Sequence, residues 1–163
     1  MIGGLILLAL VTIQRLGEAI YGERNRRRML AEGATESGEA HWPYLFALHA
    51  SWLIGLWVIA PGRPLIPIFV LLYLLLAVFR VWVMASLGSR WTTHIVVQPG
   101  LPRIKAGPYR FIDHPNYVVV VGELAILPLA FGLPLYALFF TVWNAVMLSI
   151  RIRAENRALA ALG

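Results

Sequence analysis

The sequence has no cysteine and little charge. None of its 163 residues is cysteine, and only 13% are Asp, Glu, Lys or Arg. Disulfides, thiolate nucleophiles and cysteine-ligated metal sites are therefore excluded. The histidines are not paired at the spacing typical of a zinc site, so we expect no metal centre. An ordinary soluble domain is also excluded, because a chain of this length with 60% hydrophobic residues could not bury them all in its own core.

Long apolar stretches are what the sequence has instead. The mean hydropathy is +0.73, and the stretches lie at about 2–21, 42–60, 65–85, 117–132 and 134–150. The first three approach the ~20 residues that cross a bilayer as a helix, whereas the last two are shorter and indicate a tight hairpin. We therefore expect an all-α, polytopic transmembrane helix bundle of about five spans, in a single domain over residues 1–163. Four spans are the alternative, if the last pair crosses only partly.

Arginine and lysine lie between alternate stretches. Residues 22–41, 86–116 and the segment after 150 carry most of the cations, whereas the connection at 61–64 carries only Arg63. Five spans bring the three cationic segments to one side, which the positive-inside rule places in the cytoplasm. The net charge of +6 follows this topology and not a nucleic-acid-binding face, so no nucleic-acid partner is expected. The expected location is the plasma membrane (the inner membrane of a two-membrane cell), as a multi-pass protein among membrane lipids.

Polar residues also lie inside the apolar stretches. At about 1.5 Å per helical residue, all fall within about 6–12 Å of the expected cytoplasmic end: Arg15, Glu18, His49, Arg80, Glu123 and Asn144. One interpretation is that the long side chains snorkel to the membrane surface or form mutual salt bridges, such as Arg15 with Glu18 or Arg80 with Glu123. The other is a shared polar cavity open to the cytoplasm. The common depth favours the cavity, in which a lipid-like molecule could place its polar head.

The most informative segment is residues 107–117, Gly-Pro-Tyr-Arg-Phe-Ile-Asp-His-Pro-Asn-Tyr. Gly-Pro predicts a turn, and Asp113 or His114 followed by Pro115 predicts the start of a helix. His114 and Tyr117 then stand on one helix face at the membrane surface. The amides and dipole of a helix start suit a carboxylate. The alternatives are that His114 only caps the helix and that Tyr117 belongs to the interfacial aromatic belt.

This segment resembles the isoprenylcysteine carboxyl methyltransferase family when it is taken with two others. These are residues 91–96, Trp-Thr-Thr-His-Ile-Val, and residues 151–155, Arg-Ile-Arg-Ala-Glu. The resemblance covers residues 80–160 best and is greatest to bacterial members that O-methylate alkylpyrones or alkylresorcinols. It implies an integral membrane enzyme with a cofactor pocket on the cytoplasmic side. The cofactor would be S-adenosyl-L-methionine, and the methyl acceptor a carboxylate, enol or phenol of a lipophilic or prenylated molecule that enters from the bilayer.

The resemblance also implies site residues. Cofactor contacts would come from Gly107, Tyr109, His114, Pro115, Tyr117 and Glu155. Arg151 would be catalytic or would bind the acceptor's carboxylate, with an ordinary surface ion pair to Glu155 as the alternative, since the two are four residues apart on one helix. A phenolic acceptor would need a base, for which Glu123 and His114 are the catalytic candidates. Glu123 lies about two turns below Tyr117, and its alternative role is as a structural partner of Arg80.

Two departures from the family pattern bear on the acceptor. Asp113 stands where the family usually has a basic residue, and Asn156 stands where it usually has a second acid. Both weaken the case for a prenylated cysteine more than the case for methyl transfer. Two other functions stay open. An NADPH-dependent membrane reductase would need more cations for the cofactor's additional phosphate, and a non-enzymatic membrane subunit would not account for the polar segment 107–117.

Overall fold

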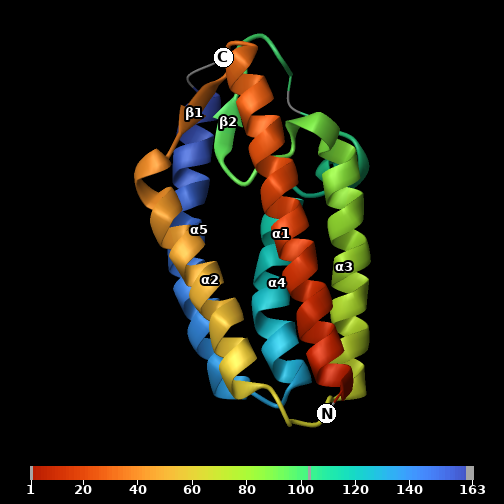
Figure 1. Ribbon diagram of the computed structural model, residues 1–163. Coiled ribbons are helices and arrows are strands. Elements are labelled where there is room, and N and C mark those ends of the chain that lie inside the picture. The colour runs from red at the N-terminus through yellow and green to blue at the C-terminus, as the bar shows by residue number, and fades with distance from the viewer. Residues whose placement is uncertain (1, 103, 161–163) are drawn as a thin grey trace.

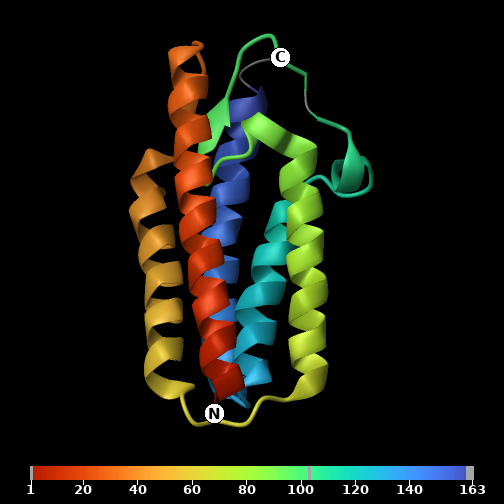
Figure 2. The same cartoon turned by 45° about the vertical axis from the view of Figure 1, so that its right-hand side comes forward.

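The computed structural model describes residues 2–102 and 104–160, so Arg103 of the cationic segment and the end of the expected 1–163 domain lie outside the description. Its α-helices run along one axis as a bundle (Figure 1, Figure 2), with the bounds α1 Ile2–Ala31, α2 Trp42–Ile59, α3 Pro67–Leu87, α4 Pro115–Ala130 and α5 Pro134–Ala160. The predicted polytopic helix bundle is confirmed. Large apolar side chains cover its outer surface, as a lipid-facing bundle requires.

The helix lengths correct the expected spans. Helices α1, α2, α3 and α5 are long and apolar enough to cross a membrane. The expectation that the last stretch ends near residue 150 is wrong, because α5 is continuous for 27 residues. Hydropathy falls after residue 150, but Arg, Ala and Glu are strong helix formers and continue the helix. Only α4 is short. Its 16 residues span about 24 Å, against a hydrocarbon core of about 30 Å.

Proline and glycine set the ends of the helices. Proline stands at the first or second position of α2, α3 and α4, and α5 begins at Pro134. At a helix start its missing N–H costs nothing, since those amides have no helical partner. Gly132 turns the chain between α4 and α5 with φ +66°. There the Leu133 N–H donates to the Pro128 carbonyl at 3.0 Å, which closes the predicted hairpin.

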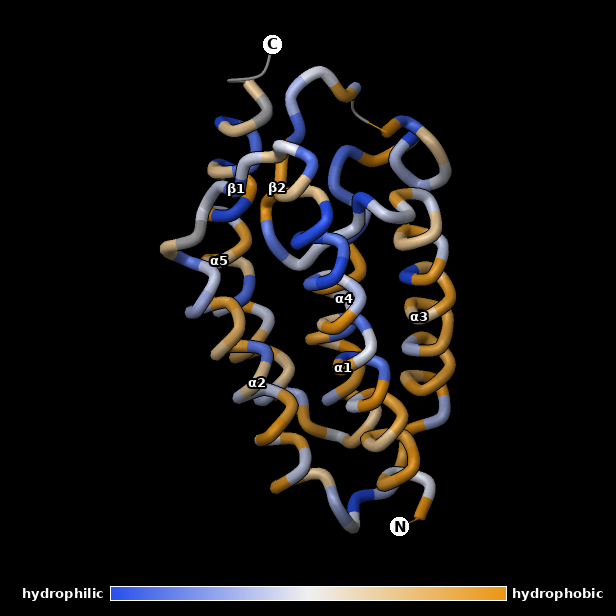
Figure 3. Tube along the Cα trace, turned by 45° about the horizontal axis from the view of Figure 1, so that its top comes forward, coloured by the Kyte–Doolittle hydropathy of each residue, from blue (hydrophilic) through white to orange (hydrophobic). Residues whose placement is uncertain are grey.

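The two ends of the bundle differ. The N-terminal end holds the short connections 60–66 and 131–133. The other end holds the long loop that joins α3 to α4, the end of α5 and a two-stranded sheet (Figure 1). Strand β1, Thr35–Ser37, pairs antiparallel with β2, Ile95–Val97. The polar residues gather at this second end (Figure 3). The sequence gives no sign of β1, because residues 22–41 were interpreted as a basic loop.

The helix core is continuous through α1, α2 and α4. Its most deeply buried side chains include Leu8, Trp52, Leu56, Leu124 and Leu127. Helix α4 packs along both α3 and α5. A Cβ at Gly122 would lie 2.8 Å from Leu76 of α3, so a small residue is needed for this close approach. The packing fixes α4, and with it the polar segment that leads into it.

Candidate active site

Four charged side chains form a buried ionic cluster between α1, α3 and α4. Arg15 contacts Glu18 at 3.0 Å and Glu123 at 2.5 Å, while Arg80 contacts Glu18 at 3.1 Å and also pairs with Glu123. Glu123 is 0% exposed and Arg80 is 3% exposed. Both predicted salt bridges are confirmed. Two guanidinium groups face two carboxylates, so the cluster is electrically balanced at a depth where an unpaired charge would be costly.

A cavity of about 610 Å³, hereafter the helix cavity, lies mainly between α1 and α2 beside this cluster. Arg15, His49, Arg80 and Asn144 are among the polar residues that line it. Much of its remaining wall is apolar, and the lining residue Leu16 is 60% exposed on the outer surface of the bundle. A cavity shared by the predicted polar residues other than Glu123 is thus present together with the predicted salt bridges, whereas its opening to the cytoplasm stays a prediction. The helix cavity combines a polar interior with a wall that reaches the lipid-facing surface.

Asn144 carries unused hydrogen-bonding capacity in this cavity. It is 0% exposed, and neither atom of its side-chain amide has a partner in the described part of the chain. The Nε of Arg15 is unpartnered in the same way. A buried amide without a partner costs about 1–3 kcal/mol. The helix cavity therefore suits a molecule with at least one hydrogen-bonding oxygen.

A second cavity of about 340 Å³, hereafter the loop cavity, lies under the long loop. Its wall includes residues of β2, the start of α4 and the end of α5, together with Gln98, Leu101 and Ile104. Six residues line both cavities and so form their junction: Trp91, Thr92, His94, Asn116, Tyr117 and Arg151. Two molecules, one in each cavity, would meet at this junction.

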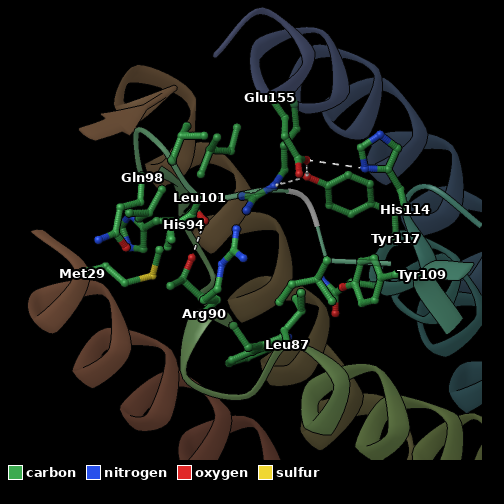
Figure 4. A pocket seen from close by; sticks show the side chains of 18 of the residues that line it. Met29, Leu87, Arg90, His94, Gln98, Leu101, Tyr109, His114, Tyr117 and Glu155 are labelled. Carbon is green, nitrogen blue, oxygen red and sulfur yellow. Dashed lines mark hydrogen bonds and ion pairs between the residues drawn. The ribbon is translucent and has the colours of Figure 1, made fainter. Parts of the chain in front are cut away.

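A hydrogen-bonded cluster at the junction joins α4 to α5 (Figure 4). The Tyr117 hydroxyl donates to Glu155 and accepts from Arg151 Nε at 3.0 Å. A second Arg151 nitrogen donates to the Thr93 carbonyl at 2.7 Å. His114 Nδ1 lies 3.7 Å from Glu155, and its ring stacks on Tyr117 with centroids 5.2 Å apart. The continuous α5 places Arg151 and Glu155 one turn apart, facing the start of α4.

Burial and hydrogen bonding distinguish the predicted site residues from their purely structural alternatives. His114 stands at the N-cap position of α4, yet its side chain makes no capping hydrogen bond. Arg151 is 7% exposed and forms no ion pair with Glu155 among the residues described, so an ordinary surface pair is wrong. Trp91, which lines both cavities, is 3% exposed. Tyr117 is held on two sides by hydrogen bonds, which a belt residue does not require.

The predicted cofactor residues are brought together around the loop cavity. Tyr109, His114, Tyr117 and Glu155 line it, whereas Gly107 and Pro115 shape the backbone beside it. Gly107 has φ +54°, and a Cβ there would lie 2.0 Å from the Ser86 hydroxyl of α3. Glycine is therefore required on both conformational and steric grounds.

One predicted cofactor-binding residue, Tyr109, has a shifted pKa. Burial, with the nearby Glu155 charge, raises the pKa of Tyr109, so its phenol stays protonated.

Of the three predicted catalytic residues, Arg151 lines both cavities and His114 lines only the loop cavity, while Glu123 lines neither. The contacts of Glu123 match its alternative role as partner of Arg80. The catalytic roles themselves stay predictions.

His94 and Glu36 form a further polar group at the junction, which the sequence analysis did not identify as part of the site. His94 Nδ1 contacts Glu36 of β1 at 2.5 Å, and the other Glu36 oxygen accepts from Arg26 of α1 at 2.6 Å. Trp42 stacks on the His94 ring with centroids 4.4 Å apart. Burial lowers the pKa of His94 despite the opposing effect of Glu36. The sequence signal was only His94 inside a family motif, since nothing pointed to β1 as its partner strand.

Comparisons with known proteins agree with this architecture. The family model described as "Isoprenylcysteine carboxyl methyltransferase (ICMT) family" matches residues 68–161. The chain is 35% identical over 167 residues to "Uncharacterized protein YpbQ" of Bacillus subtilis (strain 168), a match that covers 94% of this chain and 95% of that protein. No solved structure matches. The family match spans α3, the connection from α3 to α4, and both α4 and α5, and the chain therefore belongs to the isoprenylcysteine carboxyl methyltransferase family of membrane methyltransferases.

Proposed function

We propose that the protein transfers a methyl group from S-adenosyl-L-methionine to an oxygen atom of a lipophilic acceptor. The observation that carries this proposal is the junction of two cavities at Tyr117 and Arg151. The loop cavity has a mixed polar and apolar wall, and the helix cavity has a largely apolar wall that reaches the bundle surface. This arrangement suits a reaction between a water-soluble donor and a lipid, which must meet without either leaving its own environment.

The loop cavity has the chemistry to hold the donor. Its volume of about 340 Å³ falls within the range of ~300–1,000 Å³ that is usual for ligand sites. Glu155 can accept hydrogen bonds from a ribose diol, and Tyr109 and Tyr117 offer aromatic faces to an adenine ring or a sulfonium. His114 and the first turn of α4 can bind a carboxylate. When bound, S-adenosyl-L-methionine supplies a methyl group that is already activated by its positive sulfur.

The chain's own task is then positioning. Arg151 holds Tyr117 on one side and the Thr93 carbonyl on the other, so its guanidinium is fixed at the junction. From there it can orient an electron-rich acceptor oxygen towards the donor. Correct placement of two reactants can lower a barrier by about 7–11 kcal/mol.

The acceptor is proposed to enter the helix cavity from the bilayer. The exposed lining residues Leu16 and Phe46 mark where the cavity reaches the outer surface between α1 and α2. An apolar tail could remain there while the head reaches Asn144 and the junction. The carboxylate, enol and phenol acceptors expected from sequence all carry the oxygen that this path requires.

The junction is further proposed to face the cytoplasm. A chain without cysteine allows single cysteines to be introduced at Arg27 and Arg63, which lie at opposite ends of the bundle. In intact cells, a membrane-impermeant thiol reagent should label the Arg63→Cys variant and not Arg27→Cys. Labelling of Arg27→Cys alone would reverse the proposed orientation.

Equilibrium binding tests the function most directly. Detergent-purified protein should bind labelled S-adenosyl-L-methionine and not NADPH. Glu155→Gln should weaken that binding roughly tenfold or more, because a hydrogen bond to a charged group is worth about 1.5–3 kcal/mol. Glu32→Gln is the matched control, since its carboxylate is 52% exposed and lies outside both cavities. Binding of NADPH alone would favour a reductase, and binding of neither a non-enzymatic subunit.

A further inference from the structure

We propose that His94 is a catalytic base that removes the proton from a phenol or enol acceptor, and that Glu36 positions it for this task. The inference rests on the proposed methyl transfer and narrows its acceptor class. A carboxylate acceptor is already ionised near neutral pH and needs no base. A phenol, with an ordinary pKa of about 10, does need one.

The geometry is that of an oriented imidazole. Glu36 lies 2.5 Å from Nδ1, so this nitrogen carries the proton and Nε2 is left to accept one. Nε2 has no hydrogen-bond partner among the described residues, and His94 lines both cavities. Glu36 is fixed in turn by Arg26 at 2.6 Å and by its place in β1, while Trp42 covers one face of the ring. A base held by a carboxylate that is itself held is the general pattern of activated catalytic groups.

The other candidates for this role are less well placed relative to the two cavities. Both oxygens of Glu123 are engaged by Arg15 and Arg80, and the residue lines neither cavity. His114 lines the loop cavity and lies 3.7 Å from Glu155. His94 is the histidine that lines both cavities, the place where the acceptor oxygen must lie.

The proposed step balances. The acceptor O–H bond breaks and its proton passes to His94 Nε2, while the acceptor oxygen forms a bond to the methyl carbon. The bond between that carbon and the donor's sulfur breaks, and its electron pair stays on sulfur. His94 becomes an imidazolium that Glu36 stabilises, and it then releases the proton to water. The charged groups around His94 are Glu36 of β1 and Arg26 and Glu23 of α1. The lowered pKa of His94 keeps the ring neutral at neutral pH, so that Nε2 is free to accept a proton.

The test compares two acceptors in the purified protein. A 5-alkylresorcinol serves as the phenolic probe and a farnesylated N-acetylcysteine as the carboxylate probe. His94→Gln should lower kcat on the phenol about 100-fold or more, the usual contribution of a general base, and leave binding of S-adenosyl-L-methionine intact. Turnover of any carboxylate probe should change far less. His41→Gln is the matched control, because His41 lies near the same end of the bundle and lines neither cavity.

A second measurement needs no methyl donor. An alkylated nitrophenol changes its absorbance when it loses its proton, so its bound form reports directly on proton transfer. The wild-type protein should ionise the bound probe at a lower pH than free solution does, and His94→Gln should abolish this shift. Glu36→Gln should lower the pKa of His94 and move the acidic limb of turnover to lower pH, an effect that a merely structural contact between β1 and β2 would not produce.

The outcomes separate the inference from the proposed function. If wild-type protein binds no S-adenosyl-L-methionine, the proposed function fails. If wild-type protein methylates the phenol and His94→Gln does so equally well, His94 is not the base. Loss of donor binding in His94→Gln would also overturn the inference, by assigning the residue to the donor site. A wild-type enzyme that methylates only the carboxylate would exclude the phenolic acceptor and with it the need for a base.

Discussion

Replacing Glu123 with Gln should destabilise the bundle strongly. The substitution keeps the size and one accepting oxygen of the side chain, but removes a negative charge that is 0% exposed. Arg15 and Arg80 would then share only Glu18, which leaves one positive charge uncompensated. Breaking a buried ion pair on one side costs about 3–5 kcal/mol, a large part of the ~5–15 kcal/mol that stabilises a typical fold. The double variant Arg80→Gln/Glu123→Gln restores the balance and should be more stable than Glu123→Gln alone.

The assay is equilibrium unfolding in mixed micelles, with the free energy of unfolding extrapolated to the native detergent. A double-mutant cycle over Arg80 and Glu123 should give a coupling of at least about 1 kcal/mol. If Glu123→Gln loses less than that, or the two substitutions add, the charge-balance reasoning is refuted. Methyl transfer by the double variant then tests the other prediction for Glu123. Loss of turnover on a phenol with intact donor binding would support Glu123 as the base in place of His94.

Three further predictions address the junction and its surroundings. Tyr117→Phe removes the hydroxyl that links Arg151 to α4 and should lower donor affinity or turnover about tenfold, as measured by binding and initial rates. Gly107→Ala should lower the melting temperature and weaken donor binding, since its φ of +54° and the nearby serine hydroxyl both oppose a side chain; an unchanged melting curve would contradict this. Acidification should destabilise the protein in two steps. The fold lowers the pKa of His94, so the unfolded chain binds a proton at this residue more readily than the folded protein does. The free energy of unfolding therefore decreases as the pH falls below 6.5, the ordinary pKa of histidine. Burial alone would raise the pKa of Glu36, but hydrogen bonding to a cation and to His94 lowers it, so its contribution is lost below about 4.5. A melting temperature that is flat from pH 7 to 4 would refute both.

Much of the fold followed from sequence because apolar length and cation placement are local signals. Residues 42–60 and 65–85 matched α2 and α3 closely. The ends failed where hydropathy and helix propensity disagree: α1 extends through its arginines to Ala31, and α5 extends past Arg151 to Ala160. A charged helix that leaves the membrane carries no hydropathy signal, although it is as helical as the span it continues.

The site was predictable in proportion to how local its residues are. His114 and Tyr117 share one helix face, and their spacing alone predicts that they meet. The pairing of Glu36 with His94 depends on two three-residue strands that are far apart in the chain, and neither strand has a pattern strong enough to identify it. The network around Glu123 was foreseen as pairs and not as a four-membered cluster, because the relative rotation of α1, α3 and α4 is set by packing.

The arginines of the proposed reactive junction and those of the ionic cluster differ in how they are paired. Arg15 and Arg80 each contact two carboxylates, which neutralise their charge within the bundle. Arg151 is 7% exposed, yet its hydrogen bonds go to the Tyr117 hydroxyl and the Thr93 carbonyl, and no carboxylate lies within ion-pair distance among the described residues. A buried charge held by neutral groups is costly unless something else stabilises it. An anionic oxygen at the junction would do so, and that stabilisation grows as a phenol gives up its proton to His94. In the proposed reaction, the positive charge of Arg151 would therefore draw an ionising acceptor oxygen into place.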